Sequence, residues 1–107
     1  MDNKKIKIES GTINFWIEKQ KIIFNDNKVN PIISINPDGG SIFILKDTDN
    51  KLKIFYVVLD KGRIDLEYDV SNLLSNERHM ITFTWNIDNK LSLFIDTQEV
   101  INKKVEF

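Results

Sequence analysis

Cysteine is absent from the 107-residue sequence, and glycine and proline are scarce, with four and two residues respectively. Without cysteine the chain has no disulfides, no thiolate metal ligands and no cysteine nucleophile. The longest hydrophobic run, residues 54–59, is far too short to cross a bilayer. No apolar segment follows the basic N-terminus, so it lacks the pattern of a signal peptide. We therefore predict a soluble chain without membrane insertion. The compartment stays open, because a domain of a longer extracellular or surface protein would have the same composition.

Charge of one sign does not dominate the sequence. Fifteen Lys and Arg residues stand against 16 Asp and Glu residues, and the two signs are interspersed, for a net charge of −1. Such a chain offers no basic face to a phosphate backbone, so we do not expect it to bind nucleic acid. At this length, residues 1–107 are predicted to form a single domain around one core.

A sustained helical period is missing as well, and alternation with period two takes its place. Residues 79–85 and 91–96 each put their apolar side chains on one side, and a polar turn at residues 86–90 joins them. Pro31 favours an edge or first position in its strand. The other predicted strands, separated by turn-rich segments, are residues 5–8, 12–17, 29–35, 42–45, 52–59, 64–68 and 99–107.

Turn signals separate the predicted strands, and helical signals are almost absent. Residues 36–40 (NPDGG) form the strongest turn signal, and residues 47–51 and 60–62 are typical of hairpin loops. Residues 71–77 are the only candidate for a helical turn. Short strands between frequent turns predict an all-β sandwich or barrel.

Three stretches taken together resemble the concanavalin A-like lectin/glucanase superfamily, and its laminin G-like domains above all. They are GTINFWI at residues 11–17, HMITFTW at residues 79–85 and LFID at residues 93–96, with a similar middle hairpin at residues 39–55. The resemblance implies an antiparallel two-sheet β-sandwich of jelly-roll type, in a short version. Arg78 stands where the family usually has Trp, and Thr97 where it usually has Gly. These departures imply a lost core anchor and a changed turn after Asp96.

The predicted strand at residues 64–68 and the position after it carry three carboxylates on one face, Asp65, Glu67 and Asp69. Neighbouring carboxylates on such a face lie about 6.5–7 Å apart along the strand. The related laminarinase-type hydrolases display an E-x-D-x-x-E pattern, which D-x-E-x-D does not match. A solvated strand face is the favoured interpretation; contact with a sugar or a metal, and then hydrolysis, are the alternatives.

Two aromatic residues are candidates for stacking on a sugar ring. Trp16 falls on the less apolar face of its strand, and Tyr68 lies next to the carboxylates in the sequence. Core or interface packing is the favoured interpretation for Trp16. For Tyr68 it is the alternative, since Tyr68 has the same parity as the core-facing positions of its strand. His79, the only histidine, is predicted to be a hydrogen-bonded structural residue.

Residues 47–50 (DTDN) look like the start of a calcium loop but lack its glycine and its distal glutamate. Hairpin turn chemistry is the favoured interpretation. The resemblance implies calcium at a rim of the fold, with no motif that places its ligands, and we expect no other cofactor.

Function follows only in outline, because the superfamily includes lectins, protein-binding modules and glycoside hydrolases. We predict a non-catalytic binding module for a glycan or protein partner, with the ligand-binding candidates Trp16, Asp65, Glu67, Tyr68 and Asp69. The alternative is a structural or assembly domain of a larger surface, fibre or phage-type protein, in which open edge strands form a homo-oligomer. A glycoside hydrolase is a third class, which rests only on the three carboxylates.

Overall fold

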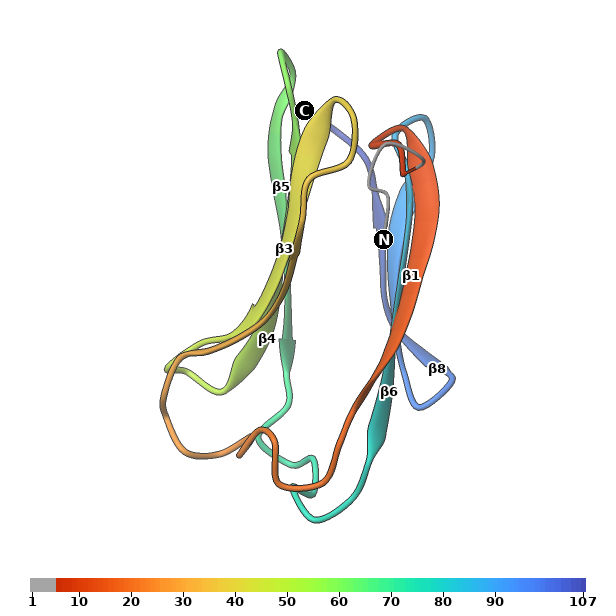
Figure 1. Ribbon diagram of the computed structural model, residues 1–107. Helices are drawn as coiled ribbons and strands as arrows, with labels where there is room; N and C mark the ends of the chain where they lie inside the picture. The colour runs from red at the N-terminus through yellow and green to blue at the C-terminus, as the bar shows by residue number, and fades with distance from the viewer. Residues whose placement is uncertain (1–5) are drawn as a thin grey trace.

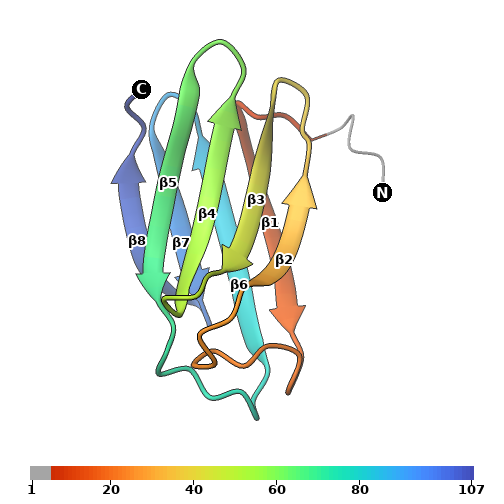
Figure 2. The ribbon, with the colours of Figure 1, turned by 90° about the vertical axis from the view of Figure 1, so that its left-hand side faces the viewer.

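The computed structural model describes residues 6–107 and has eight strands in two antiparallel sheets that face one another (Figures 1 and 2). One sheet has the order β1-β6-β7-β8 and the other the order β2-β3-β4-β5. This is the predicted two-sheet β-sandwich of jelly-roll type. The strands are β1 (Ser10–Ile17), β2 (Asn30–Ile35), β3 (Gly40–Lys46), β4 (Lys51–Val58), β5 (Gly62–Asp69), β6 (His79–Asn86), β7 (Lys90–Ile95) and β8 (Gln98–Lys104).

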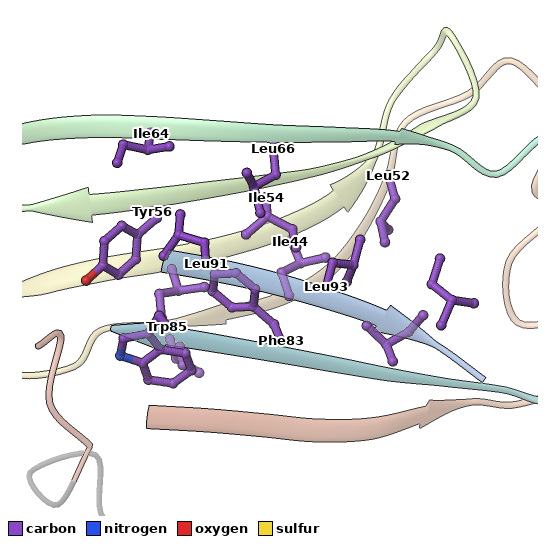
Figure 3. Packing of buried hydrophobic residues seen from close by; sticks show 14 of the residues in the cluster. Ile44, Leu52, Ile54, Tyr56, Ile64, Leu66, Phe83, Trp85, Leu91 and Leu93 are labelled. Carbon is purple, nitrogen blue, oxygen red and sulfur yellow. The ribbon is translucent and has the colours of Figure 1, made fainter. Parts of the chain in front are cut away.

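The core lies between the two sheets, and seven of the eight strands, β1 to β7, contribute buried side chains to it. Phe83, Leu91 and Leu93 of one sheet meet Ile44 and Ile54 of the other, and all five are inaccessible to solvent (Figure 3). Burial of each such side chain stabilises the fold by about 1.5–3 kcal/mol. The period-two pattern of the sequence is therefore the main determinant of the architecture.

Two glycines meet specific steric demands. Gly39, in the predicted turn at residues 36–40, has a φ of +92°, which side chains rarely tolerate. Gly11 lies opposite Trp85 in the ladder of β1 and β6, and a Cβ there would overlap the indole ring. Gly11 therefore leaves room for the indole of Trp85 against β1.

The sequence predicts a strand at residues 5–8, but residues 6–8 form a single bridge and no strand. Lys5 lies outside the described residues. Only Lys7 forms a bridge, parallel to Asp38. Two backbone hydrogen bonds join the segment to Asp38. Two side chains hold it as well: the Trp85 indole donates to the Lys7 carbonyl (2.8 Å) and the Tyr56 hydroxyl donates to the Ile8 carbonyl. It closes the edge of the core without extending a sheet.

The candidate helical turn at residues 71–77 is also wrong. Two tight turns replace it, closed by hydrogen bonds from Leu73 to Val70 and from Glu77 to Leu74. Ser75 instead accepts hydrogen bonds from the segment after β1: its carbonyl from the Gln20 amide (2.8 Å) and its hydroxyl from the Phe24 amide (3.3 Å). These long-range bonds compete with a local helix. No helix long and apolar enough to span a membrane occurs in residues 6–107.

Candidate functional site

Trp16 is on the outer face of β1, as its parity predicts, and 49% of its surface is exposed. The guanidinium of Arg78 lies over its ring, 4.3 Å from the ring centroid, and also forms an ion pair with Glu18 at 2.9 Å. Arg78, which stands where the family usually has a core Trp, is therefore a surface residue that covers one face of Trp16. A cation–π contact of this exposed kind contributes about 0.5–1 kcal/mol.

An open hollow of about 370 Å³ lies beside Trp16, between strands β1 and β2. Both are edge strands of their sheets, on the same side of the sandwich (Figure 2). Its lining is largely apolar, with one acidic and one basic side chain. The Trp16 hollow is lined by Phe15, Trp16, Ile17, Glu18, Lys21, Ile22, Pro31 and Ile32. Apolar walls with a few charged groups can hold a flat ring or an apolar side chain and orient its polar substituents.

The carboxylates of β5 point away from the core, and each has a partner close to it in the fold. Asp65 pairs with Arg63 at 2.8 Å and Glu67 with Lys51 at 3.5 Å. Asp69 accepts hydrogen bonds from the hydroxyl and the amide of Ser71, which lower the pKa of the Asp69 carboxyl. This arrangement fits a solvated strand face.

The structure does not bring the predicted ligand-binding residues together. Trp16 belongs to the β1-β6-β7-β8 sheet, whereas Asp65, Glu67 and Asp69 belong to the other sheet, on its edge farthest from β2. Tyr68 is half-buried and packs against the core, on the face of β5 opposite to the carboxylates. Trp16 and the three carboxylates are therefore two separate candidate patches.

The residues of the predicted calcium loop are engaged by a lysine. The Lys53 ammonium lies 2.9 Å from Asp47 and 3.2 Å from Asp49. Its hydrogen bond is the main reason why the pKa of the Asp47 carboxyl is lowered, and the two carboxylates raise the pKa of Lys53. In the part of the chain that the structure describes, no group of three or more His, Cys, Asp or Glu side chains could hold a metal ion. The loop has the hairpin chemistry that the sequence favours.

Lys46, at the end of β3, was not expected from the sequence: it has no exposed surface. Its ammonium donates to the Asp26 carboxylate (2.7 Å), to the Lys28 carbonyl (2.7 Å) and, at 3.4 Å, to the Asn50 side chain. The hydrogen bond from Lys46 lowers the pKa of the Asp26 carboxyl. This ion pair, with Lys46 fully buried and Asp26 partly exposed, fixes the chain that leads into β2.

His79 is 4% exposed, and both of its ring nitrogens have acceptors. Nδ1 lies 2.7 Å from the Asp96 carboxylate and Nε2 lies 2.8 Å from the Leu74 carbonyl. Burial alone would lower the pKa of His79, but these two acceptors outweigh it, and the net shift is upward. Because both partners only accept, the full pair of hydrogen bonds requires the imidazolium. The prediction of a hydrogen-bonded structural histidine is confirmed, and Nε2 is not free to act on a nucleophile.

Comparisons with known proteins identify the fold. No protein-family profile matches the sequence, and no curated protein matches it. Among solved structures, the receptor binding domain of botulinum neurotoxin mosaic serotype C/D matches 92% of this chain with a TM-score of 0.70 and 21% identity. The botulinum neurotoxin serotype D binding domain matches 98% of it with a TM-score of 0.73 and 18% identity.

A laminin structure shares the same architecture. Domains LG4-5 of the mouse laminin alpha1 chain match 90% of this chain with a TM-score of 0.64 and 14% identity. The matched region is 25%, 27% and 24% of the three solved chains in turn, so this chain spans about a quarter of each. At such low identity these likenesses show the fold: a β-sandwich shared with laminin G domains and with a part of toxin receptor-binding domains.

Proposed function

We propose that this chain is a non-catalytic binding module of the laminin G-like kind, and that it recognises a glycan or a protein partner at the Trp16 hollow. The observation that carries this proposal is a half-exposed tryptophan on the rim of an open, largely apolar hollow. Ligand sites are commonly concave, with apolar and aromatic walls and a few polar groups that orient the ligand. Glu18 and Lys21 supply a hydrogen-bond acceptor and a donor at the same rim.

The solved structures with this fold support a binding role at the level of the module. They include domains named for receptor binding in botulinum neurotoxins and the LG domains of laminin. Because this chain spans only about a quarter of those chains, the proposal concerns the single sandwich and carries over none of their partners.

Amide NMR of labelled protein, titrated with pooled oligosaccharides in the presence of calcium, tests the glycan form of this proposal. We expect shifts to gather on Trp16 and the lining of the hollow, and we expect Trp16→Ala to abolish them. Glu67→Ala, on the opposite sheet, is the matched control and should leave them unchanged. Shifts confined to β5 would move the site to the carboxylates. A well-dispersed spectrum that never moves would remove the glycan and leave the protein partner to be sought.

An assembly role is the second candidate, and the open edges of both sheets favour it. The glycoside hydrolase class has weaker support, because Asp65, Glu67 and Asp69 each face solvent with a partner of their own. It would be revived if the parent chain cleaved a polysaccharide and Glu67→Ala did not.

A further inference from the structure

The two sheets have four edge strands, and three of them carry the features by which proteins prevent edge-to-edge pairing. Charged side chains, proline and bulges are such features. In β2 they are Pro31 and a register shift before Ile33. In β8 they are two lysines near its end and a register shift opposite Leu93 and Phe94. In β5 they are four charged side chains, Arg63, Asp65, Glu67 and Asp69.

Strand β1 has none of these features. Its sequence, SGTINFWI, contains no charged residue and no proline, and all eight residues pair in unbroken register with β6. Within residues 6–107 no strand pairs with its other edge. It is therefore the one edge strand in the described chain that has neither a bulge nor a charged residue and whose outer edge is open.

The hydrogen-bond pattern identifies which groups of β1 are open. The Ile87 amide donates to the Glu9 carbonyl at 2.7 Å, in the same register as the β1–β6 ladder. Hydrogen-bonded and non-hydrogen-bonded pairs alternate along an antiparallel ladder. The odd-numbered residues of β1 therefore bond to β6. The even-numbered residues turn their N–H and C=O groups to the free edge, and they are Ser10, Thr12, Asn14 and Trp16.

We propose that this edge pairs with β1 of a second copy of the chain. The two strands run antiparallel about a twofold axis at Asn14, and two four-stranded sheets join into one of eight strands. Twofold homodimers of this self-complementary kind are the commonest oligomers. The inference stands apart from the identity of the ligand proposed above, although the Trp16 hollow borders the same edge of β1.

Charge complementarity favours this register and a second copy as the occupant. Pairing centred on Asn14 brings Glu9, at one end of β1, towards Lys19 beyond the other end of β1 in the second copy, and it does so twice. Opposite charges across a ladder stabilise it and like charges destabilise it.

Apolar complementarity acts on the inner side of the same edge. Ile13 and Phe15 point inward but stay half-buried, because the sandwich is open between β1 and β2. In the dimer, Ile13 of one copy lies opposite Phe15 of the other, next to the wall of the hollow formed by Pro31 and Ile32. The dimer therefore removes from water the apolar surface that one sandwich leaves exposed.

Sedimentation velocity over a range of concentrations tests this pairing. We expect the mass of the parent chain to double as concentration rises, and Thr12→Pro to remain a monomer throughout. Proline at position 12 removes an N–H that the monomer does not use, so the sandwich should tolerate it. Asn102→Pro places the same change at an outward position of β8, and it should dimerise like the parent.

A charge exchange tests the register without changing the backbone. Lys19→Glu should weaken the dimer roughly tenfold, and adding Glu9→Lys should restore it. If circular dichroism shows that Thr12→Pro is unfolded, Lys19→Glu and the double variant with Glu9→Lys still test the pairing of β1 with β1. A parent chain that stays monomeric, or an assembly that neither Thr12→Pro nor Lys19→Glu weakens, would overturn the proposal. The latter result would point to another surface.

Discussion

Lys46 and His79 are two buried cations with the same arrangement of partners but different chemistry. Each reaches one carboxylate and one backbone carbonyl at 2.7–2.8 Å: Asp26 and Lys28 for Lys46, Asp96 and Leu74 for His79. Both lie at the end of the sandwich where residues 18–29 and 70–78 run without regular structure (Figure 2, lower end). The carbonyl groups of such segments lack partners within a helix or sheet, and a buried cation can satisfy them.

These two anchors, Lys46 and His79, differ in the number of N–H donors that they offer to their acceptors. An ammonium group points three donors at its acceptors, and Lys46 meets a third acceptor in Asn50. A neutral imidazole has only one N–H, so His79 satisfies both Asp96 and Leu74 only when it is protonated. One end of the sandwich is therefore held by two similar sites, of which the His79 site is expected to respond to pH.

Loss of Lys46 should have the largest effect on stability. Lys46→Met keeps much of the apolar stem but leaves Asp26 without its cation and the Lys28 carbonyl without its donor. Lys46 is fully buried and its partner Asp26 is partly exposed, so the loss should exceed that of an exposed ion pair. Urea unfolding at neutral pH should show this loss. Lys53→Met removes a more exposed ammonium that also has two carboxylate partners, and it should cost much less; equal losses would contradict this explanation.

The sequence contains a signal for Lys46 that the strand prediction cut off. Lys46 has the same parity as Ile42 and Ile44, which point into the core, but the predicted strand ended one residue earlier, at Leu45. A lysine on the inward side of an apolar strand needs a buried acceptor. Asp26 supplies it from 20 residues away, and local pattern does not reveal such a contact.

The sequence indicated which way single side chains of the candidate site point, but not where they lie relative to one another in the fold. Alternation placed Trp16 on the less apolar face of its strand, and its side chain is half exposed. Alternation says nothing about which sheet a strand joins, so it could not show that Trp16 and Glu67 lie on different sheets. The hollow depends on β1 and β2 being edges on the same side, which is a property of the whole topology.

The pH dependence of stability should separate the two anchors. Since folding raises the pKa of His79, its stabilising contribution is complete below the pKa of an unfolded histidine, about 6.5, and is lost as pH rises through the folded value. The urea midpoint should therefore fall from mildly acidic to mildly alkaline pH. Glu77 adds a favourable charge near the ring, as Asp96 does.

His79→Gln and Asp96→Asn should both flatten this dependence, because each removes one half of the charged pair. Lys46→Met should leave its slope unchanged while lowering stability at every pH. A parent chain whose midpoint is constant across this range would mean that His79 keeps the same proton in the folded and unfolded states.

The turns that support the two anchors give the smallest predicted effect. Asn50, beside Lys46, has a φ of 60°, which asparagine tolerates, whereas Thr97, next to Asp96, has a φ of 73°. A β-branched residue is strained in this region, and glycine is not. The implied change after Asp96 is therefore the presence of a strained threonine in a two-residue hairpin turn. Thr97→Gly should raise the free energy of unfolding by about 1 kcal/mol.

Thr48→Gly is the matched control, because Thr48 is a turn threonine whose own φ is not positive. At position 48, glycine adds conformational freedom to the unfolded chain and relieves no strain in the folded chain. Stability should therefore fall slightly. If both substitutions lower the urea midpoint, strain at Thr97 is not stored in the fold. If only Thr97→Gly raises it, the turn that positions Asp96 for His79 is held against its own backbone preference, and the tight pairing of Asp96 with His79 is part of what holds it.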